Sequence, residues 1–181
     1  MRRRRTRRRT ASFSGRSTNR ARRSTAPPAP ADPAPAGGPL GKADFVLVLK
    51  GPRRLLLLAG NRVLREYRVA LGRNPRGPKR NQGDGRTPEG RYFIEARSAQ
   101  SGFHRALHIS YPNEADLDFA RRAGLAPGGG VMIHGLPNAA GWVGDAHQGF
   151  DWTDGCIAVT DDEMDEIWEL VDDGTPIEIR P

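Results

Sequence analysis

Residues 151–163 read DWTDGCIAVTDDE and hold the strongest signals of the chain for local structure and for chemistry. Cys156 is the single cysteine in 181 residues, so its thiol forms no internal disulfide and serves either packing or chemistry. Gly155 before it lets the backbone approach a substrate closely. The apolar residues after it predict a short strand, and residues 160–163 form a capping box that starts a helix. We therefore predict a thiol at a glycine turn, followed by a strand and a capped helix.

A histidine that can activate this thiol lies upstream, in the pair His134-Gly135. An imidazole close to a cysteine lowers the pKa of the thiol and makes it a nucleophile. The backbone N–H groups of Gly155 and Cys156 are candidate donors to an oxyanion, because consecutive amides at a glycine turn can point at one site. Each residue also has a purely structural interpretation, as a buried cysteine or a turn histidine.

Four ordered segments carry a resemblance to a known family. Residues 131–135 (VMIHG) and 153–157 (TDGCI) resemble the active-site signature of the L,D-transpeptidases, or YkuD-type domains, which is His-Gly, a spacer, and then Ser/Thr-x-Gly-Cys with a hydrophobic residue. Residues 87–92 (TPEGRY) resemble a second family segment, and residues 174–179 its last strand. The resemblance covers about residues 43–181 and implies a mainly β fold with a few helices, the β-sandwich-like catalytic fold of that family.

The resemblance also implies roles. Cys156 matches the nucleophile, His134 the base, and Gly135 the residue whose carbonyl orients the imidazole. The implied reaction is acyl transfer on peptidoglycan stem tetrapeptides through a thioester at Cys156, which gives 3→3 crosslinks or attachment to another amine. No metal or organic cofactor is implied. Two alternatives stay open: a thiol hydrolase that cleaves at the same diaminopimelate centre, and a non-catalytic wall-binding module.

Two departures from the family pattern concern substrate binding. Asp154 stands where the family often has His, and Ala158 stands where it often has Arg. An arginine there is a natural carboxylate clamp, so Arg86, Arg91 or Arg105 is expected to replace it. The aromatic side chains around residues 141–152 are candidates to contact substrate or to pack. The substrate-binding residues that we expect are Thr153, Asp154, Trp142 and Arg86.

Other histidines have less specific interpretations. His104 and His108 are four residues apart, but without a nearby glutamate in the metalloprotease pattern, so no metal site is expected. His147 lies in the Gly-rich segment 141–149, which is expected to be a loop with this histidine exposed.

Charge divides the chain into two parts. Of its 29 basic residues, 11 are arginines in residues 1–23, and only one of its 21 acidic residues precedes residue 40, so residues 40–181 hold 18 basic and 20 acidic residues. We predict an Arg-rich disordered tail with a Pro/Ala linker over residues 1–39 and one catalytic domain over residues 40–181. We expect no specific nucleic-acid partner, because the tail has no aromatic stacking residue beyond Phe13. We also expect a monomer.

The expected location follows from the resemblance, which implies the cell envelope or periplasm. Residues 1–39 contain no recognisable signal peptide, since no apolar core follows the arginines. No run of 18 apolar residues predicts a transmembrane segment.

Hydrophobic periodicity predicts mainly strands. The run at residues 45–49 is expected to be buried on both faces, and residues 63–69 to alternate, with Val63 on the same face as Tyr67. Residues 72–90 are expected to form a long loop. Helices are predicted over residues 114–123, capped by Asn113, and from Thr160 to Gly174. The remaining predicted strands are residues 55–58, 92–96, 107–111, 131–134, 156–159 and 177–179.

Overall fold

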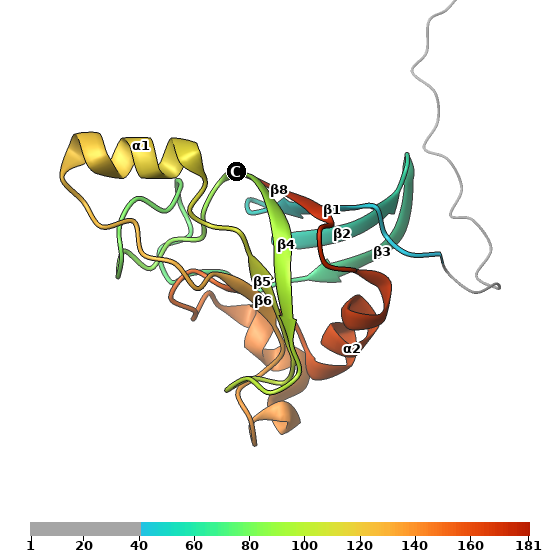
Figure 1. The fold of residues 1–181 in the computed structure, drawn as a ribbon. Coiled ribbons are helices and arrows are strands. Elements are labelled where there is room, and N and C mark those ends of the chain that lie inside the picture. The colour runs from blue at the N-terminus through green and yellow to red at the C-terminus, as the bar shows by residue number, and fades with distance from the viewer. Residues whose placement is uncertain (1–40) are drawn as a thin grey trace, which may run out of the picture. The chain divides into compact units, whose positions relative to one another are not determined.

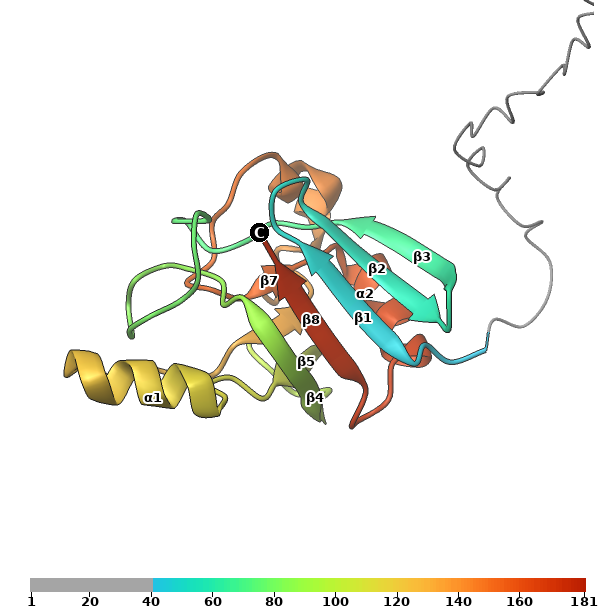
Figure 2. The same cartoon turned by 90° about the horizontal axis from the view of Figure 1, so that it is seen from above.

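A computed structural model describes residues 41–181, so the predicted tail and linker lie outside the described residues. Eight strands are joined in the order β3-β2-β1-β8-β4-β5-β6-β7, as Figures 1 and 2 show for most of them. The elements in chain order are β1 (Phe45–Leu49), β2 (Arg54–Ala59), β3 (Arg62–Arg68), β4 (Gly90–Ser98), β5 (Ala106–Ile109), α1 (Glu114–Ala123), β6 (Met132–His134), η1 (Gly141–Gly149), β7 (Ile157–Ala158), α2 (Asp161–Leu170) and β8 (Pro176–Arg180). The predicted mainly β fold with a few helices is confirmed.

The sheet divides at β4, which pairs with a different partner along each half. Residues 90–93 pair with β8, whereas residues 94–98 pair with β5, with a register shift between Ile94 and Ala96. Side chains from both halves and from α2 form one buried core. Helix α2 lies behind β1 and β2 in Figure 2, and α1 lies beyond the sheet on the side of β4. Within residues 41–181, no helix is both long and apolar enough to cross a bilayer.

Two predictions about strand faces are wrong. β1 is not buried on both faces: Val46 and Val48 are buried, but the three residues that alternate with them are only partly covered. In β3, Val63 is 47% exposed while Leu64 is buried. The register against β2 slips at this point, from Leu57 opposite Arg65 to Leu58 opposite Val63, so a bulge reverses the faces.

Both predicted helices form, with the predicted N-caps. Asn113 and Thr160 each complete a capping box with the third residue of the helix. Helix α2 ends at Leu170 rather than at Gly174, because Val171 already has extended backbone angles. Gly174 instead forms the turn into β8, with φ of 84° and its N–H bonded to Ile94 O at 2.8 Å.

The predicted loop of residues 72–90 contains no helix or strand before β4 and is held by a buried lysine of the segment after β1. Lys50 Nζ donates to Gly77 O at 2.7 Å, to Thr87 O at 2.9 Å and to Glu89 Oε1 at 2.8 Å. Burial lowers the pKa of Lys50, against the effect of Glu89. We call residues 72–90 the 72–90 loop. The middle of this loop packs on α1, where the Arg80 guanidinium lies 4.1 Å from the centre of the Phe119 ring.

Candidate active site

The pairing of β6 with β7 brings the predicted histidine and cysteine together. The two strands run parallel, with Ile133 opposite Ile157 and His134 opposite Ala158. Ile133 and Ile157 are fully buried in the core. Because side chains alternate along a strand, His134 and Ala158 belong to the other face, and so does the position of Cys156 just before β7. His134 and the position of Cys156 thus lie on one face of the sheet, with Cys156 two residues before the residue that pairs with His134.

The His134 ring has a defined tautomer. Its Nδ1 lies 2.6 Å from Gly135 O, and because a carbonyl only accepts, Nδ1 carries the proton. In the neutral ring, Nε2 therefore keeps a lone pair and can act as a base. The Phe103 ring stacks on the imidazole with centroids 3.9 Å apart, and the edge of Trp152 lies at 5.9 Å. Only 1% of His134 is exposed.

Burial sets the resting protonation of both groups. Burial lowers the pKa of His134 below its usual value, a hydrogen bond to Gly135 opposes this shift, and the neighbouring His147 reinforces it. Burial also raises the pKa of the Cys156 thiol, whereas the backbone N–H of Met132 lowers it. The thiol donates to Gly130 O at 3.7 Å and makes no hydrogen bond to the described imidazole. Both shifts favour the neutral form, thiol for Cys156 and imidazole for His134.

Thr153 braces the turn that presents Cys156. Its hydroxyl donates to Cys156 O at 2.8 Å and accepts from the Gly155 N–H at 3.1 Å. The Gly155 amide, one of the two predicted oxyanion donors, is thus already engaged. The N–H of Cys156 has no hydrogen-bond partner among residues 41–181. This amide is the donor that the turn leaves available.

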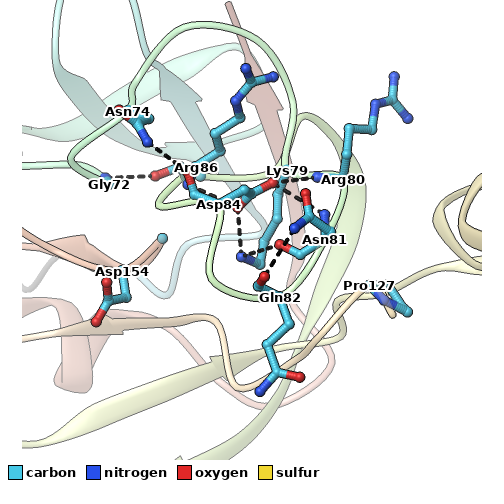
Figure 3. A network of polar contacts seen from close by, with 12 residues as sticks. Gly72, Asn74, Lys79, Arg80, Asn81, Gln82, Asp84, Arg86, Pro127 and Asp154 are labelled. Atoms are coloured by element: carbon cyan, nitrogen blue, oxygen red, sulfur yellow. Dashed lines mark hydrogen bonds and ion pairs between the residues drawn. The ribbon is translucent and has the colours of Figure 1, made fainter. Parts of the chain in front are cut away.

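The predicted substrate-binding residues lie in different settings. Asp154 is exposed and forms an ion pair with Arg73, and Trp142 is 86% exposed on η1. Arg86 makes no ion pair with a described acid, and it lines a cavity of about 390 Å³ with Asn74, Pro75 and Arg76. Figure 3 shows its side chain directed away from Asp154.

The other two candidate arginines differ in how closely they are paired. Arg105 pairs with Asp165 and lies over the Trp168 ring. Arg91 is 81% exposed and reaches Glu178 only at 3.8 Å, so its guanidinium stays accessible together with that of Arg86.

Two expectations about residues 141–149 are wrong. The segment is not an irregular loop but contains short 3₁₀ turns, η1, with a break at Gly144. His147 is only 3% exposed, because Trp152 covers it and donates Nε1–H to its Nδ1 at 3.3 Å. A contact of this kind, between residues five apart in an irregular segment, leaves no periodic signal in the sequence.

The two histidines His104 and His108 are not part of a larger cluster of potential metal ligands in the described part of the chain. His104 Nε2 lies 2.6 Å from Asp165 Oδ1, an ion-pair arrangement with α2. Residues 41–181 contain no group of three side chains suited to hold a metal ion.

Sequence reasoning missed Lys79 of the 72–90 loop. This lysine is 4% exposed and pairs with Asp84 at 2.9 Å (Figure 3). It lowers the pKa of the Cys156 thiol, against the larger effect of burial. The only sequence signal was a lysine and an aspartate five residues apart in a Gly/Pro-rich loop, which gives no indication of burial.

Acid is expected to destabilise the fold through the buried histidines. Burial lowers the pKa of His134 and of His147 below 6.5 in the folded chain. As the pH falls, the unfolded chain therefore binds protons at these two histidines before the folded chain does. Stability should therefore be highest above pH 6.5 and fall as the pH drops through that value. Thermal unfolding of the full chain between pH 8 and pH 5 measures this. The variant His147→Gln should show a shallower fall, and an identical pH dependence would contradict the assignment.

Comparisons with known proteins cover most of the described chain. A family model described as "L,D-transpeptidase catalytic domain" (YkuD) matches residues 43–179. The chain is 28% identical over 138 residues to "Putative L,D-transpeptidase YafK" of Escherichia coli K12, over 73% of this chain and 48% of that protein. It thus spans about half the length of this curated relative.

Solved structures show the same fold. The helical cell shape determining protein Pgp2 of Campylobacter jejuni is similar with a TM-score of 0.57 and 24% identity, over 75% of this chain and 46% of that chain. An L,D-transpeptidase of Mycobacterium smegmatis is similar with a TM-score of 0.52 and 16% identity, over 76% of this chain and 58% of that chain. At these identities the likeness concerns the fold alone.

Proposed function

Because the chain belongs to the L,D-transpeptidase catalytic domain (YkuD) family, we propose that it transfers the acyl group of a peptidoglycan stem tetrapeptide through a thioester at Cys156. One observation carries this proposal. The His134 imidazole is held by Gly135 O with its basic nitrogen free, on the strand beside the cysteine turn. This is the arrangement of base, orienting group and nucleophile that thiol catalysis requires.

The first half of the reaction forms the thioester. Cys156 releases its contact with Gly130 O and gives its proton to His134 Nε2. The sulfur attacks the carbonyl carbon of the L-centre of diaminopimelate, and the oxyanion accepts from the Cys156 N–H. Collapse breaks the bond to the terminal D-Ala, whose nitrogen takes the proton from the imidazolium. The products are a thioester, free D-Ala and a neutral His134.

The second half returns the thiol. An amine of a second stem peptide attacks the thioester carbonyl while His134 accepts its proton, and the sulfur leaves as a thiolate that the imidazolium reprotonates. A 3→3 crosslink results. Attack by water in the same position gives hydrolysis, so the outcome depends on which acceptor reaches the thioester. No step requires a metal ion or an organic cofactor.

Substrate binding and location follow as parts of the same proposal. Arg86, which lacks an acidic partner among the described residues, supplies the carboxylate contact in place of an arginine at Ala158. Exposed Trp142 on η1 and Asp154 beside the turn contact the stem peptide. The protein acts as a monomer on the cell envelope, where its substrate is located.

Product analysis tests the function directly. The full chain is incubated with purified disaccharide-tetrapeptide, and the products are measured by mass spectrometry. We expect a crosslinked dimer and free D-Ala from the native chain, and neither product from Cys156→Ala. The thermal midpoint of Cys156→Ala should equal that of the native chain, which shows that the fold is kept. Cleaved fragments carrying added water, without dimers, would establish the hydrolase instead. Absence of any product dependent on Cys156 would contradict both enzymatic interpretations.

A further inference from the structure

The 72–90 loop lies directly against the turn that presents Cys156. A Cβ placed on Gly155, whose φ is +133°, would lie 2.6 Å from Arg86 O. The same position is 3.8 Å from Lys79 Nζ. The turn therefore approaches both the backbone of this loop and the ammonium of a buried lysine.

The Lys79 ammonium is held in place by its own loop. Nζ donates to Asp84 Oδ1 at 2.9 Å and contacts Asn81 O at 3.3 Å. Asp84 is fixed in turn by the backbone N–H groups of Arg80, Asn81 and Arg86 (Figure 3). An ammonium has three protons, and these contacts use two of them. The remaining proton has no partner among residues 41–181, on a side chain that reaches the Gly155 turn.

Few other charges act on the thiol. The titratable and charged side chains of the surrounding elements are Asp154 on the turn, Arg73, Lys79, Asp84 and Arg86 on the 72–90 loop, His108 on β5, His134 on β6 and His147 on η1. Among their charges, that of Asp154 has the larger effect and raises the pKa of the thiol, whereas that of Lys79 lowers it. Asp154 is exposed and paired with Arg73, so its field is screened. Lys79 is buried, so its field is screened much less.

We propose that Lys79 is a positioning residue of the active site, whose fixed positive charge beneath the Gly155 turn stabilises the negative charge on Cys156 during the reaction. The expected effect of Lys79 on the rate of acyl transfer rests on the proposed function, whereas its expected effect on the reactivity of the Cys156 thiol does not. The 72–90 loop thus acts on the cysteine turn in two ways. Arg86 packs its carbonyl on Gly155, and Lys79 supplies the positive charge.

Thiol alkylation tests this without any peptidoglycan substrate. The rate of reaction with iodoacetamide is measured against pH on the folded full chain, where Cys156 is the only thiol. In Lys79→Met the alkylation midpoint should move to higher pH, and the rate near pH 7.5 should fall about tenfold for a midpoint that is one pH unit higher. Lys79→Arg, which keeps the charge, should restore a profile close to that of the native chain.

Lys50→Met is the matched control. Lys50 is also buried and also holds the 72–90 loop, through Gly77 and Thr87, but it does not act on the thiol. We expect this variant to lose stability without a change in the alkylation midpoint. An equal change in Lys50→Met, or none in Lys79→Met, would overturn the inference and leave Lys79 a loop residue only.

A second variant keeps the test valid should Lys79→Met fail to fold. Asp84→Asn retains the ammonium and removes the carboxylate that offsets it, so the alkylation midpoint should move to lower pH. A move to higher pH would refute the role. These readouts separate the two proposals, since an altered thiol midpoint without muropeptide products would support Lys79 and oppose the acyl-transfer function.

Discussion

Replacing His134 with glutamine is expected to slow acylation of Cys156 by about 10²- to 10⁴-fold, the usual contribution of a positioned general base. Glutamine fills much of the space beside Phe103 and Trp152, but its amide cannot accept the proton of the thiol. Release of D-Ala from disaccharide-tetrapeptide, followed under single-turnover conditions, measures this step. Far-UV circular dichroism and the thermal midpoint at pH 7.5 report whether the fold is kept.

His147→Gln is the matched control for this substitution. It also removes a buried histidine beside Trp152, but one that contacts neither Gly135 nor the thiol in the described structure. We expect less than about a tenfold change in D-Ala release, since no proton transfer is assigned to this ring. Equal losses in the two variants would show that the aromatic packing matters and that His134 is not the base.

Replacing Gly155 with alanine is expected to affect both stability and catalysis strongly. The glycine has φ of +133°, a region that side-chain-bearing residues rarely adopt, and the added Cβ would meet Arg86 O at 2.6 Å. Backbone strain and the clash should together reduce the free energy of unfolding by about 3 kcal/mol. The turn must shift to relieve the clash, and displacement of the sulfur by about 1 Å can cost about 10²-fold in rate. Urea unfolding and D-Ala release measure the two effects.

Gly149→Ala is the corresponding control in the nearby η1 segment. A Cβ at Gly149 has no atom within 4 Å, and its φ is not positive. This variant should stay within about 0.5 kcal/mol of the native stability. If Gly155→Ala proved as stable and active as Gly149→Ala, the close approach of the 72–90 loop to the cysteine turn would be refuted.

The local elements of this fold could be predicted from sequence where one signal acts over a few residues. The capping box at Thr160 and the N-cap residue Asn113 predicted both helix starts, because a cap and the first turn that it bonds stand close in sequence. The strand after Cys156 was also predicted, although β7 is only Ile157–Ala158. The placement of His134 beside that strand agrees with the motif spacing, while the catalytic roles stay predictions.

What escaped prediction depends on strand register and on burial, which neither composition nor periodicity reveals. The bulge that exposes Val63 is set by the register against β2, which no periodicity within residues 62–68 reveals. Burial of His147 requires Trp152, five residues further on, to fold over it. Lys79 is charged, and charged residues are mostly exposed, so its burial against Asp84 reverses the ordinary expectation. These last two are short-range contacts that border the candidate site.

The protonated resting state of Cys156 has a consequence for the lifetime of the protein at the cell envelope proposed for it. Peroxides and disulfides react with thiolates, so a sulfur kept neutral by burial is a slow target for both. The chain holds no second cysteine that could resolve a sulfenic acid internally, and an oxidised sulfur would therefore persist or advance to irreversible forms. A thiol that ionises only as substrate arrives would thus preserve its own reactivity in an oxidising environment.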